Sequence, residues 1–513
     1  MPTARHDNTS RIVSNSILLN ARMVVVLGIN LYTSRVIFEI LGFTDFGIYN
    51  AVAGVVGILG FFTSSLSNAV QRYLGIGLGK NDSNILRTYF SHSLELLCIT
   101  AILLLIIGET AGLWFTRTRL VFPPESLTAV TWTYRFALLS CIASIVQVPY
   151  MAAMITREKM NVYAYASIFE VTVKLASVFA LKLIDKSDQL IAYSAALCVI
   201  QIIITAIYAC YCMRFPECRF KKCWDKKLIA EMTRFVGYNL FGCFSYAAGY
   251  QGSNILLNIF FGPVMNAARA ISFQVSSAVN RFSESIFTAV KPQIIKSYAA
   301  TDNGYLSNLI FSSSTLGFLF MLTLVNPILF NTSTILDIWL KDVPEHAATF
   351  TQLAIIDCLI GALATPLWLA LNATGNIRRN QTYGRAFILA SLPLSYVCLL
   401  AVPNPDIPMW GLIMAQACYL IHSLHDVCSQ LDIKAADYAK RVLMPICMAS
   451  LPALALCAME SRLVEGDMLR LLITSATSTI IITAITYRCI LSSGMRVLLT
   501  QCFTKQKVDR HDS

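Results

Sequence analysis

Long apolar runs recur from one end of this chain to the other, and they constrain its fold more than any other feature. Each run has about 20 to 25 residues, enough for a helix to cross a hydrocarbon core about 30 Å thick. Of the 513 residues 56% are hydrophobic and 13% are charged, whereas a soluble domain has about 25% charged residues. We therefore expect an all-α integral membrane protein whose spanning segments are helices and not strands.

The runs are separated by charged residues, glycine and proline, and they predict about fourteen transmembrane helices. Their approximate spans are 13–38, 46–74, 87–114, 127–154, 162–184, 189–212, 229–260, 264–290, 306–330, 348–372, 383–402, 408–428, 441–460 and 469–491. The first run has no short hydrophobic region followed by a small-residue cleavage site. The first helix is therefore expected to remain in the mature protein.

Basic residues fall mostly in alternate connections between the predicted helices. One set of connections holds Arg5, Arg11, Lys80, Arg87, Arg157, Lys159, the run "RFPECRFKKCWDKK" from Arg214, Lys291, Lys296, Arg378, Arg379, Arg385, Lys440, Arg441 and the basic tail. The other set holds far fewer, chiefly Arg117, Arg119, Lys182, Lys186 and Lys341. By the positive-inside rule both termini are expected to be cytoplasmic. The net charge of +11 then mostly reflects this bias, and a nucleic-acid partner is not expected.

The 16 cysteines are scattered singly through apolar stretches such as "ELLCITA" and "AALCVIQ". This spacing matches neither a zinc site nor a disulfide framework. We interpret them as small buried hydrophobic residues and expect no metal and no cofactor.

Two segments on either side of the long basic loop resemble each other. "SNAVQRY" (67–73) is echoed by "SSAVNRF" (276–282), and "EILGFTDFGIYNAV" (39–52) by "IFFGPVMNAARAI" (259–271). Chance recurrence of Ser-Ala-Val strings is the simpler alternative, but the shared order of helix, turn and polar-ended helix favours two parallel repeats. The predicted organisation is an N-terminal lobe (1–212), a basic linker (213–228), a C-terminal lobe (229–428), two extra helices (429–491) and a tail (492–513).

Several charges fall at membrane depth, beginning with the arginine in "SILLNARMVV" (16–25). A charge near the middle of a bilayer costs at least about 2.5 kcal/mol, so such side chains are expected to face a wet cavity. Together they predict a positively charged cleft between the lobes, and arginine suits the phosphate oxygens of an anionic substrate. The predicted substrate-binding cations are Arg22, Arg135, Lys174 and Arg269. The predicted polar face of the cleft is Asn15, Asn50, Asn68, Ser276 and Asn280, and the candidate coupling acids are Glu95, Glu170 and Asp357.

Simpler interpretations stay open for some of these residues. Lys174 and Glu170 are four residues apart and could merely neutralise each other. The stripe that begins with Asn50, Gly54 and Gly57 could serve close helix packing. The cluster "IHSLHD", with His422, His425 and Asp426, could be a proton relay or a solvated helix end.

The stretch "LYTSRVIFEILGFTDFGIYNAVAGVVGILGFFTSSLSNAVQRYLG" (31–75) resembles the opening of bacterial polysaccharide exporters of the multidrug/oligosaccharidyl-lipid/polysaccharide (MOP) superfamily, the Wzx-type O-antigen flippases. The resemblance implies two six-helix lobes in a V-shaped, MATE-like arrangement and transport by alternating access. It also implies a place in the bacterial inner membrane and an undecaprenyl-diphosphate-linked oligosaccharide as substrate. Membrane lipids, glycosyltransferases and a polysaccharide polymerase are the other partners expected on this basis.

The leading hypothesis is therefore a flippase for a lipid-linked oligosaccharide and not an enzyme. A drug or cation antiporter of the same superfamily is the alternative, in which the three acids would couple transport. A membrane polysaccharide polymerase or ligase is less favoured, because the largest predicted outer loop, around "NTSTILDIWLKDVPEHAAT", has under about twenty residues.

Overall fold

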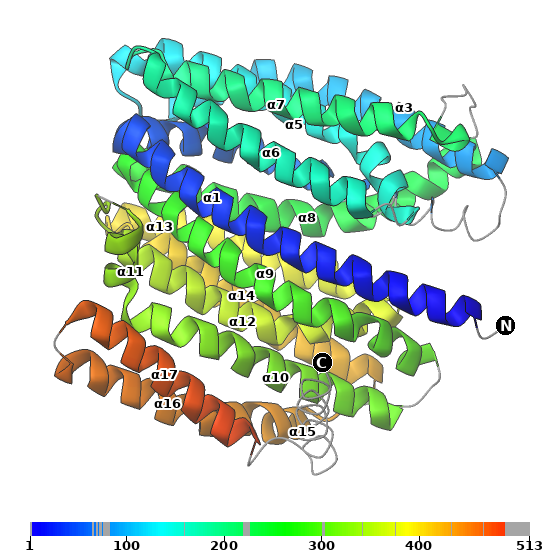
Figure 1. The fold of residues 1–513 in the computed structure, drawn as a ribbon, viewed down its shortest axis with the longest axis vertical. Coiled ribbons are helices and arrows are strands. Elements are labelled where there is room, and N and C mark those ends of the chain that lie inside the picture. The colour runs from blue at the N-terminus through cyan, green and yellow to red at the C-terminus, as the bar shows by residue number, and fades with distance from the viewer. Residues whose placement is uncertain are drawn as a thin grey trace, which may run out of the picture. The chain divides into compact units, whose positions relative to one another are not determined.

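The computed structural model describes residues 3–487 apart from 64–65, 68–69, 71–73, 75–82, 158–159, 219–225, 300–302, 341, 375, 432 and 465. These described residues are almost entirely helical and include no strand (Figure 1). Eleven helices among them are long and apolar enough to cross a membrane. The expectation of an all-helical, multi-pass membrane protein is confirmed, whereas the count of fourteen spans is not.

The helices follow the predicted apolar runs closely. They are α1 (Thr3–Ile58), α3 (Ser83–Ile107), the π-helix η1 (Gly108–Gly112), α4 (Leu113–Arg119), η2 (Pro124–Ser126), α5 (Leu127–Thr156), α6 (Met160–Ala180), η3 (Leu181–Leu183), α7 (Gln189–Cys212), η4 (Pro216–Cys218), α8 (Lys226–Phe261), α9 (Pro263–Ala299), α10 (Asn303–Phe330), α11 (Thr332–Trp339), α12 (Ala347–Thr374), the π-helix η5 (Asn380–Gly384), α13 (Arg385–Ala401), α14 (Ile407–Leu431), α15 (Ala435–Tyr438), the π-helix η6 (Ala439–Leu443), α16 (Met444–Leu463) and α17 (Asp467–Ile485).

Two glycines with left-handed backbone interrupt the helices at related points of the sequence. Gly42 has φ 74° inside α1, which joins two helical arms across a kink, and Gly262 has φ 81° between α8 and α9. A Cβ at either position would meet no heavy atom within 4 Å, so backbone conformation and not crowding favours glycine here. Both glycines lie in the segments that the sequence suggested were repeats.

The chain forms two compact units that do not follow chain order. Unit 1 is 1–274 with 340–347 and 381–412, and unit 2 is 275–339 with 348–380 and 413–513. Helices α8 and α13 therefore belong to unit 1, and α9 begins in unit 1 and continues in unit 2. These units are not the predicted lobes, whose division at 213–228 stays a prediction.

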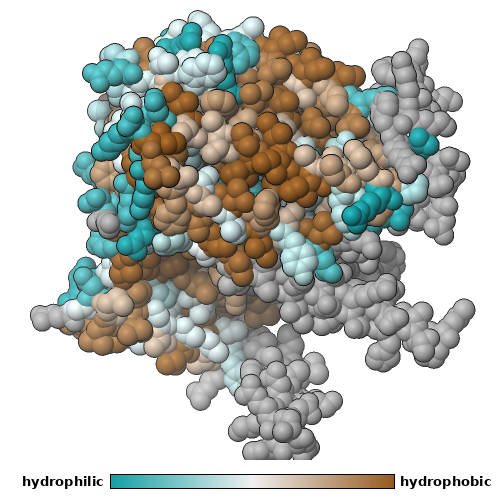
Figure 2. Space-filling view, turned by 45° about the horizontal axis from the view of Figure 1, so that its top comes forward, coloured by the Kyte–Doolittle hydropathy of each residue, from teal (hydrophilic) through white to brown (hydrophobic). Residues whose placement is uncertain are grey.

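In unit 1, α3, α5, α6 and α7 pack side by side (Figure 1). Phe90, Leu97, Ile145 and Met154 are fully buried in the apolar core that these helices share. The face of these helices that Figure 2 brings forward is largely apolar, with hydrophilic residues gathered toward its edges. Large exposed apolar side chains are expected where a helix faces lipid, because hydrocarbon solvates them as well as a protein core does.

In unit 2, helices α16 and α17 are joined to α10 by buried polar side chains. Asn326 donates through Nδ2 to Ser478 Oγ at 3.0 Å and to Cys457 Sγ at 3.3 Å. Directly after the end of α10, Asn331 donates to Thr474 Oγ1 at 2.8 Å. Hydrogen bonds between membrane helices contribute about 0.6 to 2 kcal/mol each, so these contacts fix α17 against α10.

Replacing Asn326 with alanine is expected to lower the free energy of unfolding by about 1 to 2 kcal/mol, because Ser478 and Cys457 lose a shared donor in a buried site. Thermal unfolding of the purified protein in detergent measures the change. Thr323→Ala on the same helix is the matched control, since the Thr323 hydroxyl donates only to Leu319 O within α10. Equal melting temperatures for the two variants would contradict the prediction.

Candidate functional site

A buried group of polar side chains lies where α8 meets α9 in unit 1. Asn266 donates through Nδ2 to the main-chain oxygen and to Oδ1 of Asn254, both at 2.6 Å. Asn258 donates through Nδ2 to Asn266 Oδ1 at 3.0 Å. We call these three residues and the neighbouring Arg269 the amide–arginine cluster. All four are nine-tenths or more buried.

The local sequence explains why these side chains converge. Asn254 and Asn258 are four residues apart and share a face of α8, whereas Asn266 and Arg269 are three residues apart and share a face of α9. The left-handed turn at Gly262 reverses the chain between the two helices. The polar faces of both helices are therefore brought together.

The cluster also contacts two other segments of unit 1. Asn254 donates through Nδ2 to the main-chain oxygen of Asn50 on α1 at 2.9 Å. The backbone N–H of Val121 donates to Asn258 Oδ1 at 2.8 Å. The amides thus connect α1, α8, α9 and the segment that follows α4.

Arg269 is the most buried of the predicted cations whose side chains the structure describes, with 6% of its surface exposed. Its Nη1 donates to Ser272 Oγ at 3.1 Å, and that hydroxyl donates in turn to Arg269 O at 2.8 Å. A guanidinium has five N–H donors in a fixed plane, a geometry that matches phosphate and carboxylate oxygens. Arg269 is therefore a buried cation held by Ser272, one helical turn after Asn266 on α9.

The small-residue stripe on α1 packs against α8. A Cβ at Gly54 would lie 2.7 Å from Asn254 Nδ2, and one at Gly57 would lie 3.2 Å from Gln251 Nε2. The Asn50 side chain donates to Phe46 O at 2.7 Å within α1. This part of the stripe provides close helix packing, the simpler of the two interpretations that the sequence left open.

Two predicted cations lie in ion pairs on separate helices of unit 1. Arg135 on α5 pairs with Glu109 at 3.3 Å, and these side chains are 41% and 37% exposed. Lys174 on α6 pairs with Glu170 at 2.6 Å, with exposures of 31% and 27%. Each cation is thus matched by an acid, and a shared role with Arg269 in binding substrate stays a prediction.

The remaining predicted residues of the polar face are widely distributed. Asn15 and Arg22 lie in α1, but their side chains, like all of Asn68, lie outside the described residues. In unit 2, Ser276 is buried, and its main-chain oxygen lies 3.8 Å from Cys358 Sγ, whereas Asn280 is exposed. A common polar wall made by these residues stays a prediction.

The acids considered for coupling have different surroundings. Glu95 lies 3.3 Å from His92 Nδ1 on α3, and Glu170 pairs with Lys174 as described. Asp357 is half-buried on α12. Asp426 belongs instead to the cluster considered as a proton relay or a solvated helix end. It is fully buried, 3.1 Å from Arg379 Nε and 3.4 Å from His422 Nδ1, so this carboxylate is not solvated as a free helix end would be.

Among the described residues no group of three or more His, Cys, Asp or Glu side chains is arranged to hold a metal ion. Asn254, Asn258, Asn266 and Glu109 were not singled out from the sequence. The spacing of the two asparagines in "SNILLN" would have indicated a polar helix face. Glu109 gave no such signal, because its partner Arg135 is 26 positions away on another helix.

No protein-family model matches the sequence, and no curated protein matches it. Solved structures do match the fold. The lipid II flippase MurJ in an inward-closed conformation has a TM-score of 0.66 and 11% identity, covering 93% of this chain and 99% of its own. An inward-facing multidrug resistance MATE family transporter of the MOP superfamily has a TM-score of 0.65 and 10% identity, covering 80% and 98%.

A MOP superfamily transporter from Pyrococcus furiosus, described with a binding pocket of reversed polarity, has a TM-score of 0.60 and 13% identity over 82% of this chain and 95% of its own. The chain therefore has the fold of MOP superfamily transporters. These structural neighbours are transporters and not enzymes.

Proposed function

We propose that the protein is a MOP-type transporter that moves a lipid-linked oligosaccharide across the membrane by alternating access. The observation that carries the proposal is the amide–arginine cluster. A buried guanidinium can bind two phosphate oxygens through two parallel N–H···O hydrogen bonds. Amide side chains can both donate hydrogen bonds to sugar hydroxyls and accept them. A diphosphate linked to a glycan needs both kinds of group, whereas an apolar drug needs neither.

The extent of the structural likeness also supports a lipid-linked substrate. The lipid II flippase covers 93% of this chain, whereas the multidrug transporter covers 80%. Helices α16 and α17 follow the twelve helices predicted for the two lobes, and they are fixed to α10 by hydrogen bonds. They enlarge the apolar surface of unit 2, which suits a substrate with a long polyprenyl tail.

In the proposed mechanism Arg269 holds the diphosphate, and Asn254, Asn258 and Asn266 exchange their mutual hydrogen bonds for bonds to the glycan. Arg22, Arg135 and Lys174 would guide the diphosphate during entry and exit. The proposed location is the bacterial inner membrane with both termini in the cytoplasm, as the basic connections indicate. Glycosyltransferases would supply the substrate, and a polymerase would consume the product.

The multidrug antiporter is the second candidate, since MATE transporters share the fold at nearly the same TM-score. In that case Glu95, Glu170 and Asp357 would bind the coupling ion. The two functions make opposite predictions for a strain that lacks the gene.

Deleting the gene from its own bacterium is expected to abolish the surface glycan and to cause lipid-linked oligosaccharide to accumulate in the inner membrane. Plasmid-borne wild-type protein should restore the glycan, and sensitivity to cationic drugs should stay unchanged throughout. Immunoblots of surface glycan, chromatography of extracted lipids and drug inhibition assays measure the three quantities. Normal glycan together with increased drug sensitivity would overturn the proposal in favour of the antiporter.

A further inference from the structure

Three arginines and two tryptophans gather around the turn between α4 and α5 in unit 1. We call Trp114, Arg117, Arg119, Trp132 and Arg135 the Arg–Trp cluster. The guanidinium of Arg119 lies 5.9 Å from the ring centre of Trp114, and that of Arg135 lies 5.6 Å from the ring centre of Trp132. Both tryptophans are exposed, at 57% and 45%. The proposed transport function uses neither of them.

The side chain of Arg117 on α4 contacts α5 one helical turn before Arg135. Arg117 donates through Nε to Thr131 Oγ1 at 3.1 Å. Thr131 and Arg135 are four residues apart on α5, so their Cβ atoms are about 5 to 6 Å apart on one face. Arg117 and Arg135 are therefore within about one helical turn of each other, close enough to reach the oxygens of one phosphate group.

The scaffold under these side chains is closely packed. The Tyr134 hydroxyl donates to Gly108 O at 2.8 Å, at the start of the π-helix η1. A Cβ at Gly112, at the end of η1, would collide with the same hydroxyl. Glu109 is held within η1 at 3.3 Å from Arg135 Nε. The cluster thus has three cations. Among the described residues, Glu109 is the acid that forms an ion pair with one of them, Arg135.

The depth of the cluster corresponds to lipid headgroups. The membrane-spanning stretch that contains α3 and α4 runs from Leu86 to Arg119. At 1.5 Å per residue Arg117 lies about 46 Å from Leu86, and a bilayer with its headgroups is about 40 to 45 Å thick. Tryptophan is enriched at this level of the bilayer, where its ring meets both apolar and polar surroundings.

An apolar surface leads along α3 toward the cluster. Its exposed side chains are Ile99, Ile102, Leu103, Ile106 and Ile107. Such a surface suits acyl chains, and the arginines that follow it suit a phosphate. The apolar surface, the tryptophans and the arginines thus follow one another in the same order as the acyl chains, the interface and the headgroup of a phospholipid.

We propose that the Arg–Trp cluster is a binding site for an anionic phospholipid, whose phosphate contacts Arg117 and Arg135, whose headgroup lies near the charge of Arg119 beside Trp114, and whose acyl chain lies along α3. This site is separate from the amide–arginine cluster, although Arg135 is also one of the cations proposed to guide the diphosphate. The test below therefore changes Arg117 and Arg119, which the proposed transport mechanism does not use. The proposed occupant is a bilayer lipid with a phosphate diester, and phosphatidylglycerol is the lipid used to test binding.

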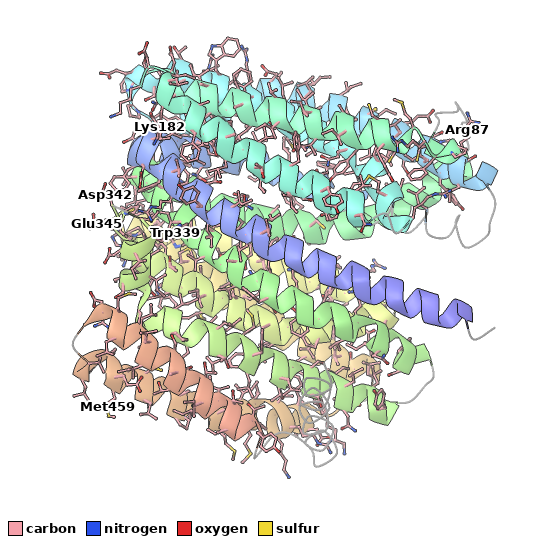
Figure 3. The ribbon with its side chains drawn as sticks, viewed as in Figure 1. Arg87, Lys182, Trp339, Asp342, Glu345 and Met459 are labelled. Carbon is pink, nitrogen blue, oxygen red and sulfur yellow. The ribbon has the colours of Figure 1, made fainter. Side chains whose placement is uncertain are left out.

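The test is a titration of the purified full-length protein in detergent with phosphatidylglycerol or phosphatidylcholine, with bound lipid counted by native mass spectrometry. Arg117→Gln/Arg119→Gln is expected to weaken phosphatidylglycerol binding about thirtyfold, since each basic residue near an anionic lipid contributes about fivefold. Lys182→Gln is the matched control. Lys182 is exposed and lies 5.6 Å from the ring centre of Phe179, at the end of the unit-1 helices opposite Arg87 (Figure 3).

A gain-of-affinity variant separates binding from misfolding. Glu109→Gln removes the acid that pairs with Arg135 and should tighten phosphatidylglycerol binding several-fold, an effect that a damaged fold does not produce. Unchanged phosphatidylglycerol binding by the double arginine variant would overturn the site. Equal wild-type binding of phosphatidylcholine, or full displacement of the lipid by millimolar inorganic phosphate, would overturn its assignment to an anionic lipid.

Discussion

Export of the surface glycan is expected to fall about a hundredfold when Arg269 is replaced by alanine. The arginine is buried one helical turn after Asn266, and removing one partner of a desolvated charge pair with a phosphate costs about 2 to 5 kcal/mol. Arg269→Lys should retain part of the activity, because lysine keeps the charge but loses the planar fork. Surface glycan in the deletion strain, complemented with each variant, measures the effect.

The matched control for this experiment is Ser272→Ala. This change removes the hydroxyl that lies 3.1 Å from Arg269 Nη1 but leaves the charge in place, so export should fall no more than a few-fold. Membrane abundance and melting temperature of every variant separate lost transport from lost protein. A well-folded Arg269→Ala protein that exports at the wild-type rate would remove Arg269 from the mechanism.

Replacing Gly47 with alanine is expected to destabilise the protein by about 3 kcal/mol, near the upper end for overpacking a core. A Cβ at Gly47 would overlap the main-chain carbonyl of Pro263, at the start of α9. A backbone carbonyl cannot rotate away as a flexible side chain can. Either α1 or the turn at Gly262 must therefore shift, and the hydrogen bonds of Asn254 to Asn50 and Asn266 shift with it.

Gly28→Ala on the same helix is the control for this change. Gly28 is exposed, and a Cβ there would meet no heavy atom within 4 Å. Alanine in a helix is favoured over glycine by about 1 kcal/mol, so this variant should melt at or above the wild-type temperature. Thermal unfolding in detergent measures both variants, and a Gly47→Ala protein as stable as Gly28→Ala would disprove the close approach.

Helix positions were predictable from this sequence, because apolar length is a local property. The kink at Gly42 and the turn at Gly262 were predictable too, since glycine between two apolar runs indicates a left-handed turn. What covers each helix face was not predictable. Periodicity placed Asn50, Gly54 and Gly57 on one face, but their partners on α8 lie some 200 positions away.

In the candidate site, contacts within one helix were predictable from the sequence, whereas contacts between helices were not. Lys174 and Glu170 are one helical turn apart, and their ion pair followed from spacing alone. The pair of Arg135 with Glu109 requires the packing of α5 against η1, which no local pattern specifies. Arg269 was identified as a buried cation, but the asparagines of the cluster were not. Asn254 and Asn258 lie on another helix, and Asn266, on α9 itself, is buried by its contacts with them.

The polar contacts of Asn326 and Asn331 have a consequence for biosynthesis. These amides enter the bilayer on α10 well before α16 and α17 leave the ribosome, and their partners Ser478 and Thr474 are on the last described helix. Until that helix is inserted, the Asn326 amide lacks its partners Ser478 and Cys457, whereas Asn331 keeps its bond to Pro327 O at 2.9 Å. A chain that ended before α16 would lack these contacts permanently, so the polar contacts of α10 are complete only when the last described helix is in place.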